Sequence, residues 1–241
     1  MNGRWAEGKI IFSDFDGTFN GYGKEKNVNA VKDFISNGGY FTFATGRLKI
    51  DGLLDGWEEI VNAPLICSQG AIVRETDGRA VYENFFDRSI AREIIDIMKT
   101  EPFGKDTDYF VHTNETETEY YKVVVTTVPE KIPELFEFFY KRFKDKIQYC
   151  YSCEYLIELL DKKSTKGSAL KIVKDLVGAK ETYAIGDYTN DISMLLAADH
   201  AVCPANASDD VKAVCKDNIL CHCNEGAVAE YINRIREDSL K

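Results

Sequence analysis

The chain of 241 residues is 44% hydrophobic and 12% aromatic, which is the composition of a folded globular protein and excludes a disordered one. Its formal net charge of -10 argues against binding to nucleic acid or to anionic membranes, because neither polyanion is attracted to an acidic surface. Residues 1–10 lack the apolar core of a signal peptide, no apolar run approaches the length of a membrane span, and the seven scattered cysteines fit reduced thiols, so we expect a cytoplasmic protein.

Short apolar segments that end in polar residues recur along the first part of the chain. Residues 9–14 form the first segment, and two others end at Thr45 and near Ser68. Each has the pattern of a strand buried on both faces of a parallel sheet. Between the first two, residues 27–39 repeat apolar side chains at helical spacing. The order strand, helix, strand predicts parallel strands joined by crossover helices.

The closing third of the chain repeats this alternation. Two further strands are predicted to end at Asp187 and near Cys203. Helices are predicted over three ranges, 165–177, 190–198 and 208–215.

Residues 85–161 have a different character. Their pattern indicates a helix, a pair of strands, a second helix and a second pair of strands. Antiparallel hairpins joined by helices predict a compact α+β unit inserted into the parallel-sheet domain. The predicted fold class is therefore α/β, with a doubly wound, Rossmann-like core formed by residues 1–84 plus 162–241 and an inserted cap domain formed by residues 85–161.

Unusual polar residues stand at the ends of the predicted strands. Asp14 and Asp16 follow the first strand, Thr45, Gly46 and Arg47 follow the second, and Asp187, Asn190 and Asp191 follow a later one. Ligands of an open parallel sheet bind beyond the carboxyl ends of its strands, so we expect four carboxylates to meet in one crevice. Such a cluster must bind protons or a cation. Mg²⁺ suits it, because this ion accepts carboxylate oxygens and completes its octahedron with water and substrate phosphate.

Lys166 carries a separate signal. It lies in the first turn of a predicted helix, where the helix dipole disfavours a cation by about 0.5 kcal/mol. We therefore expect an anion beside it. The lysine and the helix amides would form a positive site opposite the carboxylates, which suits a phosphate group.

Four segments in this order, DFDGT, FATGR, STKGSALK and GDYTNDISML, resemble the four motifs of the haloacid dehalogenase (HAD) superfamily of phosphohydrolases. The insert between the second and third motifs is similar to the α/β cap (C2B type) of the Cof-type, or IIB, subfamily. The resemblance implies a Mg²⁺-dependent phosphatase that hydrolyses small phosphomonoesters, with sugar phosphates as leading substrates, through an aspartyl-phosphate. A cap also favours small substrates because it would obstruct a phosphoprotein or a nucleic acid.

The resemblance also implies a role for each polar residue. Asp14 would be the nucleophile, and Asp16 the general acid and base. Thr45 would donate its hydroxyl to a phosphoryl oxygen, and Lys166 would neutralise the charge that develops there. The implied Mg²⁺ ligands are Asp14, Asp16 through its main-chain carbonyl, Asp187 and Asp191, and the implied substrate-binding residues are Gly17, Gly46, Arg47 and Asn190.

Two alternatives stay open at this point. A phosphomutase similar to the phosphomannomutases could share all four motifs, and a non-enzymatic phosphate-sensing protein could keep them without turnover. The chain departs from Cof-type sequences at Gln69-Gly70, where Asn-Gly is usual. His112, Lys122 and Glu154 are candidates for selecting the substrate. The sequence makes no prediction of oligomeric state.

Overall fold

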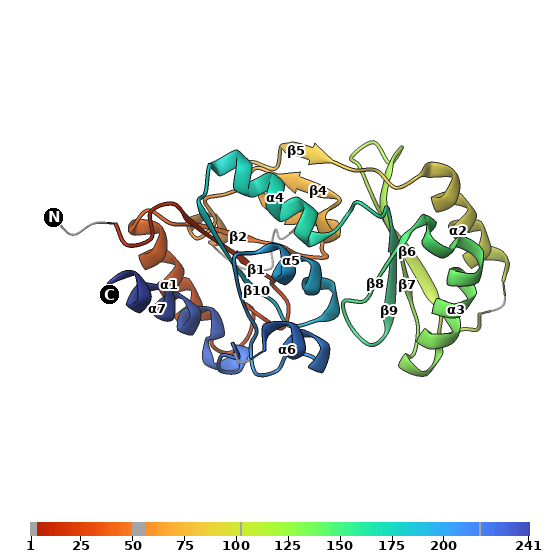
Figure 1. The fold of residues 1–241 in the computed structure, drawn as a ribbon. Helices are drawn as coiled ribbons and strands as arrows, with labels where there is room; N and C mark the ends of the chain where they lie inside the picture. Colours follow the sequence, from red (N-terminus) through yellow and green to blue (C-terminus); the bar gives the residue numbers. More distant parts are fainter. Residues whose placement is uncertain (1–3, 50–55, 102, 217) are drawn as a thin grey trace.

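The computed structural model describes residues 4–49, 56–101, 103–216 and 218–241. Figure 1 shows two parts side by side, an α/β core that holds the carboxyl terminus and an α+β cap at the opposite end. Among the described residues, no helix is both long and apolar enough to cross a lipid bilayer.

The main core sheet is parallel and has the strand order β11-β10-β1-β2. Its strands are β1 (Lys9–Ser13), β2 (Tyr40–Phe43), β10 (Glu181–Ile185) and β11 (His200–Val202). Two helices cover one face, α1 (Lys24–Ser36) and α7 (Ala227–Ser239). Three helices cover the other, α4 (Lys166–Val177), α5 (Ile192–Ala197) and α6 (Asp209–Cys215). The predicted α/β fold class is confirmed.

The sequence of β1 explains why both faces of the sheet are covered. Ile11 packs in the cluster that contains Val31 of α1 and Ile235 of α7, whereas Ile10 and Phe12 pack in the cluster formed with α4, α5 and α6. Apolar residues at consecutive positions therefore give each face of the strand its own core. Burial of each such side chain contributes about 1.5–3 kcal/mol, which neither face could gain if it were exposed to water.

The segment that follows β2 differs from the sequence prediction. β3 (Leu65–Cys67) meets β2 through a single parallel bridge and then pairs antiparallel with β4 (Ile72–Arg74), which pairs with β5 (Ala80–Glu83). β3 therefore runs parallel to β2, as predicted, and it is also the first strand of an antiparallel sheet that the sequence did not predict. The reason is the connection after it: residues Ser68–Gly70 reverse the chain at once, whereas a parallel crossover needs about a dozen residues.

The cap contains an antiparallel sheet of order β6-β7-β9-β8. Its elements are α2 (Arg88–Thr100), β6 (Asp108–Thr113), β7 (Tyr120–Thr126), α3 (Ile132–Phe143), β8 (Gln148–Cys150) and β9 (Leu156–Leu160). Both helices pack on the sheet face that points away from the core (Figure 1). Because side chains alternate along a strand, Val123 and Val125 join the helices while Lys122 points toward the core.

The predicted inserted cap is therefore confirmed as an antiparallel α+β unit. We propose that its limits are residues 85 and 161, which fall in the connections from β5 to α2 and from β9 to α4.

Helix α4 starts at a fixed point because of its caps. Thr165 precedes it in an extended conformation, and its Oγ1 accepts a hydrogen bond from the Ser168 amide at 3.0 Å. Gly178 ends the helix in the left-handed region at a φ of 66°. Lys166 consequently stands at the first helical position, beside the ends of β1 and β10.

Candidate active site

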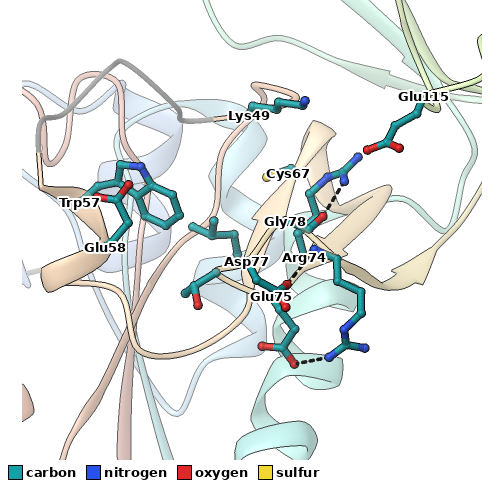
Figure 2. A pocket seen from close by; sticks show the side chains of 12 residues that line it. Lys49, Trp57, Glu58, Cys67, Arg74, Glu75, Asp77, Gly78 and Glu115 are labelled. Atoms are coloured by element: carbon teal, nitrogen blue, oxygen red, sulfur yellow. Dashed lines mark hydrogen bonds and ion pairs between the residues drawn. The ribbon is translucent and has the colours of Figure 1, made fainter.

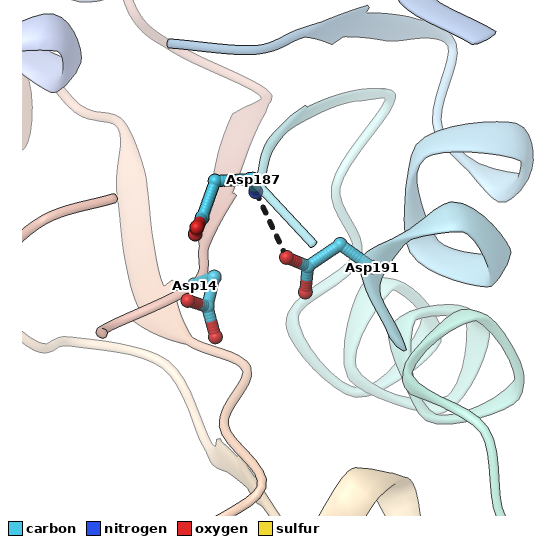
Figure 3. Close-up of side chains that lie close together, drawn as sticks. All are labelled: Asp14, Asp187 and Asp191. Carbon is cyan, nitrogen blue, oxygen red and sulfur yellow. Dashed lines mark hydrogen bonds between the residues drawn. The ribbon is translucent and has the colours of Figure 1, made fainter. Parts of the chain in front are cut away.

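Three carboxylates meet where β1 and β10 end. These strands are adjacent, with Ser13 opposite Ile185, so Asp14 and Asp187 leave the sheet side by side. Asp191 reaches them from the short turn before α5. One oxygen from each of the three aspartates lies within 4.8 Å of the other two, and Figure 3 shows the three side chains close together.

Burial of this cluster penalises its negative charge. It raises the pKa of Asp14 well above the ordinary value, and the charges of Asp191 and Asp187 add to the rise against the opposing effect of Lys166. Burial and the charge of Asp191 likewise raise the pKa of Asp187 to about 6. A cation among these oxygens would remove the repulsion, so the donor set fits a hard divalent ion.

Lys166 supplies one positive charge to the cluster. Its Nζ lies 2.6 Å from Asp14 Oδ1 and 2.5 Å from Asp191 Oδ1, and its side chain is fully buried. Burial disfavours the ammonium form, but the attraction to both carboxylates outweighs it and raises the pKa of Lys166 above its ordinary value. The anion expected beside this lysine is thus part of the protein.

Asp191 organises the site through both of its oxygens. While Oδ1 binds Lys166, Oδ2 accepts hydrogen bonds from the amides of Asp187 at 3.0 Å and of Tyr188 at 3.2 Å. The side chain therefore fixes the loop after β10 and the ammonium group at the same time.

Thr18 and Asn206 position the cluster, although the sequence analysis assigned neither. Thr18 Oγ1 donates to Asp187 Oδ1 at 2.6 Å, and Asn206 Nδ2 donates to the Gly17 carbonyl at 2.8 Å. Gly17 has a φ of +77°, and a Cβ atom there would lie 2.4 Å from Asp187 Oδ2. The DFDGT motif itself was a signal for Thr18. The Asn206 contact joins residues 189 apart in the chain and leaves no local signal.

The structure does not bring the Asp16 side chain into the carboxylate cluster. Arg47 holds it through two contacts, Nε to Oδ2 at 2.7 Å and Nη2 to Oδ1 at 2.8 Å. The hydrogen bond to Asp16 raises the pKa of Arg47. The pair is exposed, with side-chain exposures of 51% for Asp16 and 44% for Arg47.

The loop after β2 is held from two sides. The Thr45 amide donates to the Ile66 carbonyl of β3 at 2.8 Å, and the Thr45 hydroxyl oxygen accepts a hydrogen bond from the Arg47 amide at 3.1 Å. The Gly46 carbonyl accepts a hydrogen bond at 2.6 Å from Lys122 of the cap. Core and cap therefore both contact the predicted phosphate-binding residues.

A cavity of about 600 Å³ lies between the core and the cap. Its walls include Asp14, Asp16, Thr45, Gly46, Arg47 and Asn190 from the core, and Phe110, His112, Lys122, Tyr155 and Glu158 from the cap. Of the three cap residues singled out in the sequence, His112 and Lys122 line this cavity, whereas Glu154 is exposed and does not.

Gln69, where the chain departs from the family pattern, joins the core to the cap. Its Nε2 lies 2.6 Å from Ser152 Oγ and 2.9 Å from Glu158 Oε1, both in the cap. Its Oε1 accepts a hydrogen bond from Asn190 Nδ2 at 3.3 Å. Asn190 Oδ1 is buried without a hydrogen-bond partner in the described part of the chain, so a bound molecule could use it.

A second cavity, of about 580 Å³, lies beside β4 and the turn that follows. Charged side chains of its wall already have partners: Glu75 lies 3.7 Å from Arg79, and Arg74 Nη1 donates to the main-chain carbonyl of Gly78 at 2.9 Å. Figure 2 shows Arg74, Glu75 and Gly78 close together in this wall. Its described lining residues include none of the predicted site residues.

The parallel core, the inserted antiparallel cap and the aspartate cluster between them define the class of HAD-type phosphatases. The chain belongs to the family of haloacid dehalogenase-like hydrolases, whose sequence profile matches residues 11–115 and 100–232. The predicted family and phosphatase activity are confirmed.

Relatives and solved structures agree with this assignment. The chain is 25% identical over 287 aligned residues to the 5-amino-6-(5-phospho-D-ribitylamino)uracil phosphatase YwtE of Bacillus subtilis, covering 94% of this chain and 98% of the relative. The TM0651 protein of Thermotoga maritima has a similar structure, with a TM-score of 0.74, 21% identity and coverage of 93% and 96%. The subclass IIB sugar phosphatase BT4131 has a TM-score of 0.79, 18% identity and coverage of 94% and 98%.

Proposed function

We propose that the protein is a Mg²⁺-dependent phosphatase that hydrolyses small phosphomonoesters, sugar phosphates among them, through an aspartyl-phosphate on Asp14. One observation carries the proposal: Asp14, bound by Lys166 at 2.6 Å, belongs to a carboxylate cluster and lines the cavity between core and cap. The substrate class is supported by the names of similar proteins, of which one is a phosphatase of a phosphorylated ribityl compound and another a sugar phosphatase.

Asp14 acts as the nucleophile. Its carboxylate attacks phosphorus, so that a bond to Asp14 forms while the bond between phosphorus and the substrate alcohol breaks. Lys166 keeps the carboxylate oriented and offsets the charge that develops on the phosphoryl oxygens. The Thr45 hydroxyl and the Gly46 amide bind those oxygens, and Asn190, which lines the same cavity, binds the substrate.

Asp16 supplies and removes protons. It gives a proton to the leaving alcohol and then takes one from the water that hydrolyses the aspartyl-phosphate. This role requires the carboxylate to leave Arg47, whose guanidinium then faces the substrate. The change is energetically small, because an exposed ion pair of this kind contributes only about 0–1 kcal/mol.

Asp14, Asp187, Asp191 and the main-chain carbonyl of Asp16 would hold Mg²⁺. When bound, the ion offsets the repulsion between the carboxylate nucleophile and the anionic phosphoryl group. The donor chemistry fits, because the described cluster consists of carboxylates alone and burial raises the pKa of Asp14 and Asp187.

Release of inorganic phosphate from a panel of small phosphomonoesters tests the proposal. The panel includes hexose phosphates and is assayed with Mg²⁺ and with a chelator, for the wild type and for Asp14→Asn. We expect Mg²⁺-dependent release that falls at least about 10³-fold in Asp14→Asn, because the amide keeps the shape and loses the nucleophile.

Asp106→Asn is the matched control, since Asp106 is an exposed carboxylate of the cap. Retained activity in Asp14→Asn would contradict the mechanism. Interconversion of hexose phosphates without release of phosphate would show a mutase instead.

A further inference from the structure

We propose that Lys122 is a positioning residue for the phosphatase reaction: from the cap it orients the Gly46–Arg47 peptide, and through it the Thr45 hydroxyl that binds the phosphoryl group. The inference rests on the proposed function of the site. If it holds, the phosphate-binding loop has all of its contacts only when the cap is docked on the core.

Lys122 is built into the contact between cap and core. It lies on β7, its side chain is 3% exposed, and its Nζ donates to the Gly46 carbonyl at 2.6 Å. Glu158 of β9 accepts a second hydrogen bond from the same Nζ. A buried ammonium needs such partners, and here one of them is a main-chain oxygen of the core.

The peptide that Lys122 holds also carries the amide that reaches Thr45. The Gly46 carbonyl and the Arg47 amide belong to one planar group, so fixing the carbonyl fixes the direction of the N–H. That N–H donates to Thr45 Oγ1 at 3.1 Å. Since the hydroxyl oxygen already accepts a hydrogen bond, the hydroxyl hydrogen is left to donate to another group. In the proposed reaction that group is a phosphoryl oxygen.

Glu158 and Gln69 tie this contact to the rest of the site. Glu158 Oε1 accepts a hydrogen bond from Gln69 Nε2 at 2.9 Å, and a Cβ atom on Gly46 would lie 2.6 Å from the same nitrogen. The loop, Gln69 and the Lys122–Glu158 pair therefore pack closely against one another. A cap that moves away would break the Lys122 and the Gln69 contacts together, and closure around a substrate would restore them.

A double-mutant cycle tests the inference. Lys122→Met is made together with Glu158→Gln, so that no buried charge is left alone, and this neutral-pair variant is combined with Thr45→Val. The matched control is Lys131→Met, because Lys131 also contacts a carbonyl, that of Phe103, and a carboxylate, that of Asp106, but entirely within the cap. Values of kcat and KM are measured with Mg²⁺ on the best phosphomonoester of the panel.

We expect the neutral-pair variant to lower kcat about tenfold, and Lys131→Met to leave it unchanged. In the Thr45→Val background the same neutral-pair change should cost less than about threefold, because residues that act through one another are not additive.

A tenfold loss that persists in Thr45→Val would overturn the inference, as would an unchanged kcat in the neutral-pair variant. If the neutral-pair variant does not fold, Lys122→Gln with Glu158→Gln keeps a polar pair and is judged by the same cycle. If the wild type hydrolyses no ester, the proposed function fails, and the cycle is read from calorimetric binding of inorganic phosphate. Affinity that falls about tenfold only when Thr45 is present supports the inference, and any other pattern overturns it.

Discussion

Two buried charge clusters face the same cavity and differ in their balance. In the core, the three carboxylates of Asp14, Asp187 and Asp191 share one ammonium group, that of Lys166, so full ionisation would leave an excess of two negative charges. In the cap, Lys122 and Glu158 form a one-to-one pair, with side-chain exposures of 3% each. Asp14 and Asp191 are buried and Asp187 is half-buried, so both clusters are largely removed from water, yet only the second is balanced in charge.

The difference separates a reactive site from a supporting one. A balanced buried pair whose remaining atoms are hydrogen-bonded requires no further ligand. An unbalanced cluster must take up protons or a cation. The raised pKa values of Asp14 and Asp187 mean that these carboxylates bind protons more readily than usual. We therefore expect the core cluster to respond to Mg²⁺ and the cap pair to respond only to its own disruption.

The largest effect is expected from Asp187→Asn. The amide can still accept the hydrogen bond from Thr18, but the cluster loses one charge and one of the proposed metal ligands. We expect kcat/KM to fall about 10³-fold, since a bound metal contributes several kcal/mol of charge stabilisation. We also expect Mg²⁺ to raise the melting temperature of the wild type and to have no such effect on Asp187→Asn.

Differential scanning calorimetry with Mg²⁺ and with chelator provides this measurement, and Asp106→Asn serves again as the exposed control. In chelator, Asp187→Asn should be at least as stable as the wild type, because one repulsive charge is gone. A wild-type response of Asp187→Asn to Mg²⁺ would place the ion elsewhere.

Disruption of the cap pair should have the next largest effect. Lys122→Met leaves the Glu158 carboxylate buried without its cation, which we expect to lower the free energy of unfolding by about 3 kcal/mol. Adding Glu158→Gln should recover most of that loss, because the double variant holds no buried charge. Urea unfolding at pH 7.5 measures both. Equal losses in the single and double variants would show that packing, and not charge, decides the stability here.

The sequence predicted the core cluster better than the cap contacts. The ends of β1 and β10 could be located from apolar runs that stop at Asp14 and Asp187, and adjacency of parallel strands then placed these residues together. Lys166 was found because a cation at a helix start requires an anion. These inferences use local patterns plus one rule of sheet topology.

The contacts between cap and core follow no such rule. Gln69 appeared in the sequence only as a departure from a motif, and its bond to Glu158 spans 89 residues. The antiparallel turn of β3 onto β4 was also missed, because a short apolar run is the same for a parallel and an antiparallel buried strand. Long-range partners depend on how the cap docks, which no single segment encodes.

The smallest effect concerns His112, which lies next to the cap pair and stays neutral. Its Nδ1 lies 2.9 Å from Ser68 Oγ, and burial together with the charge of Lys122 lowers the pKa of His112 to about 3. The unfolded chain takes up the proton near pH 6.5, whereas the folded protein does not. Above pH 6.5 His112 therefore does not lower the free energy of unfolding. As the pH falls from 6.5 toward 3, the free energy of unfolding decreases by up to about 1.4 kcal/mol per pH unit.

Urea unfolding at pH 7.5 and pH 5.0 measures this loss. His112→Asn keeps a polar atom near Ser68 and cannot be protonated, so its decrease in stability between the two pH values should be smaller than that of the wild type by about 1–2 kcal/mol. His200→Asn is the control, because His200 is exposed on β11, and it should retain the wild-type difference. An identical decrease in the wild type and His112→Asn would show that the ring is protonated in the folded protein. In that case Lys122, Glu158 and His112 together would carry a net positive charge. The cap residues and the core cluster would then differ in the sign of their net charge, and the cap residues would no longer be neutral.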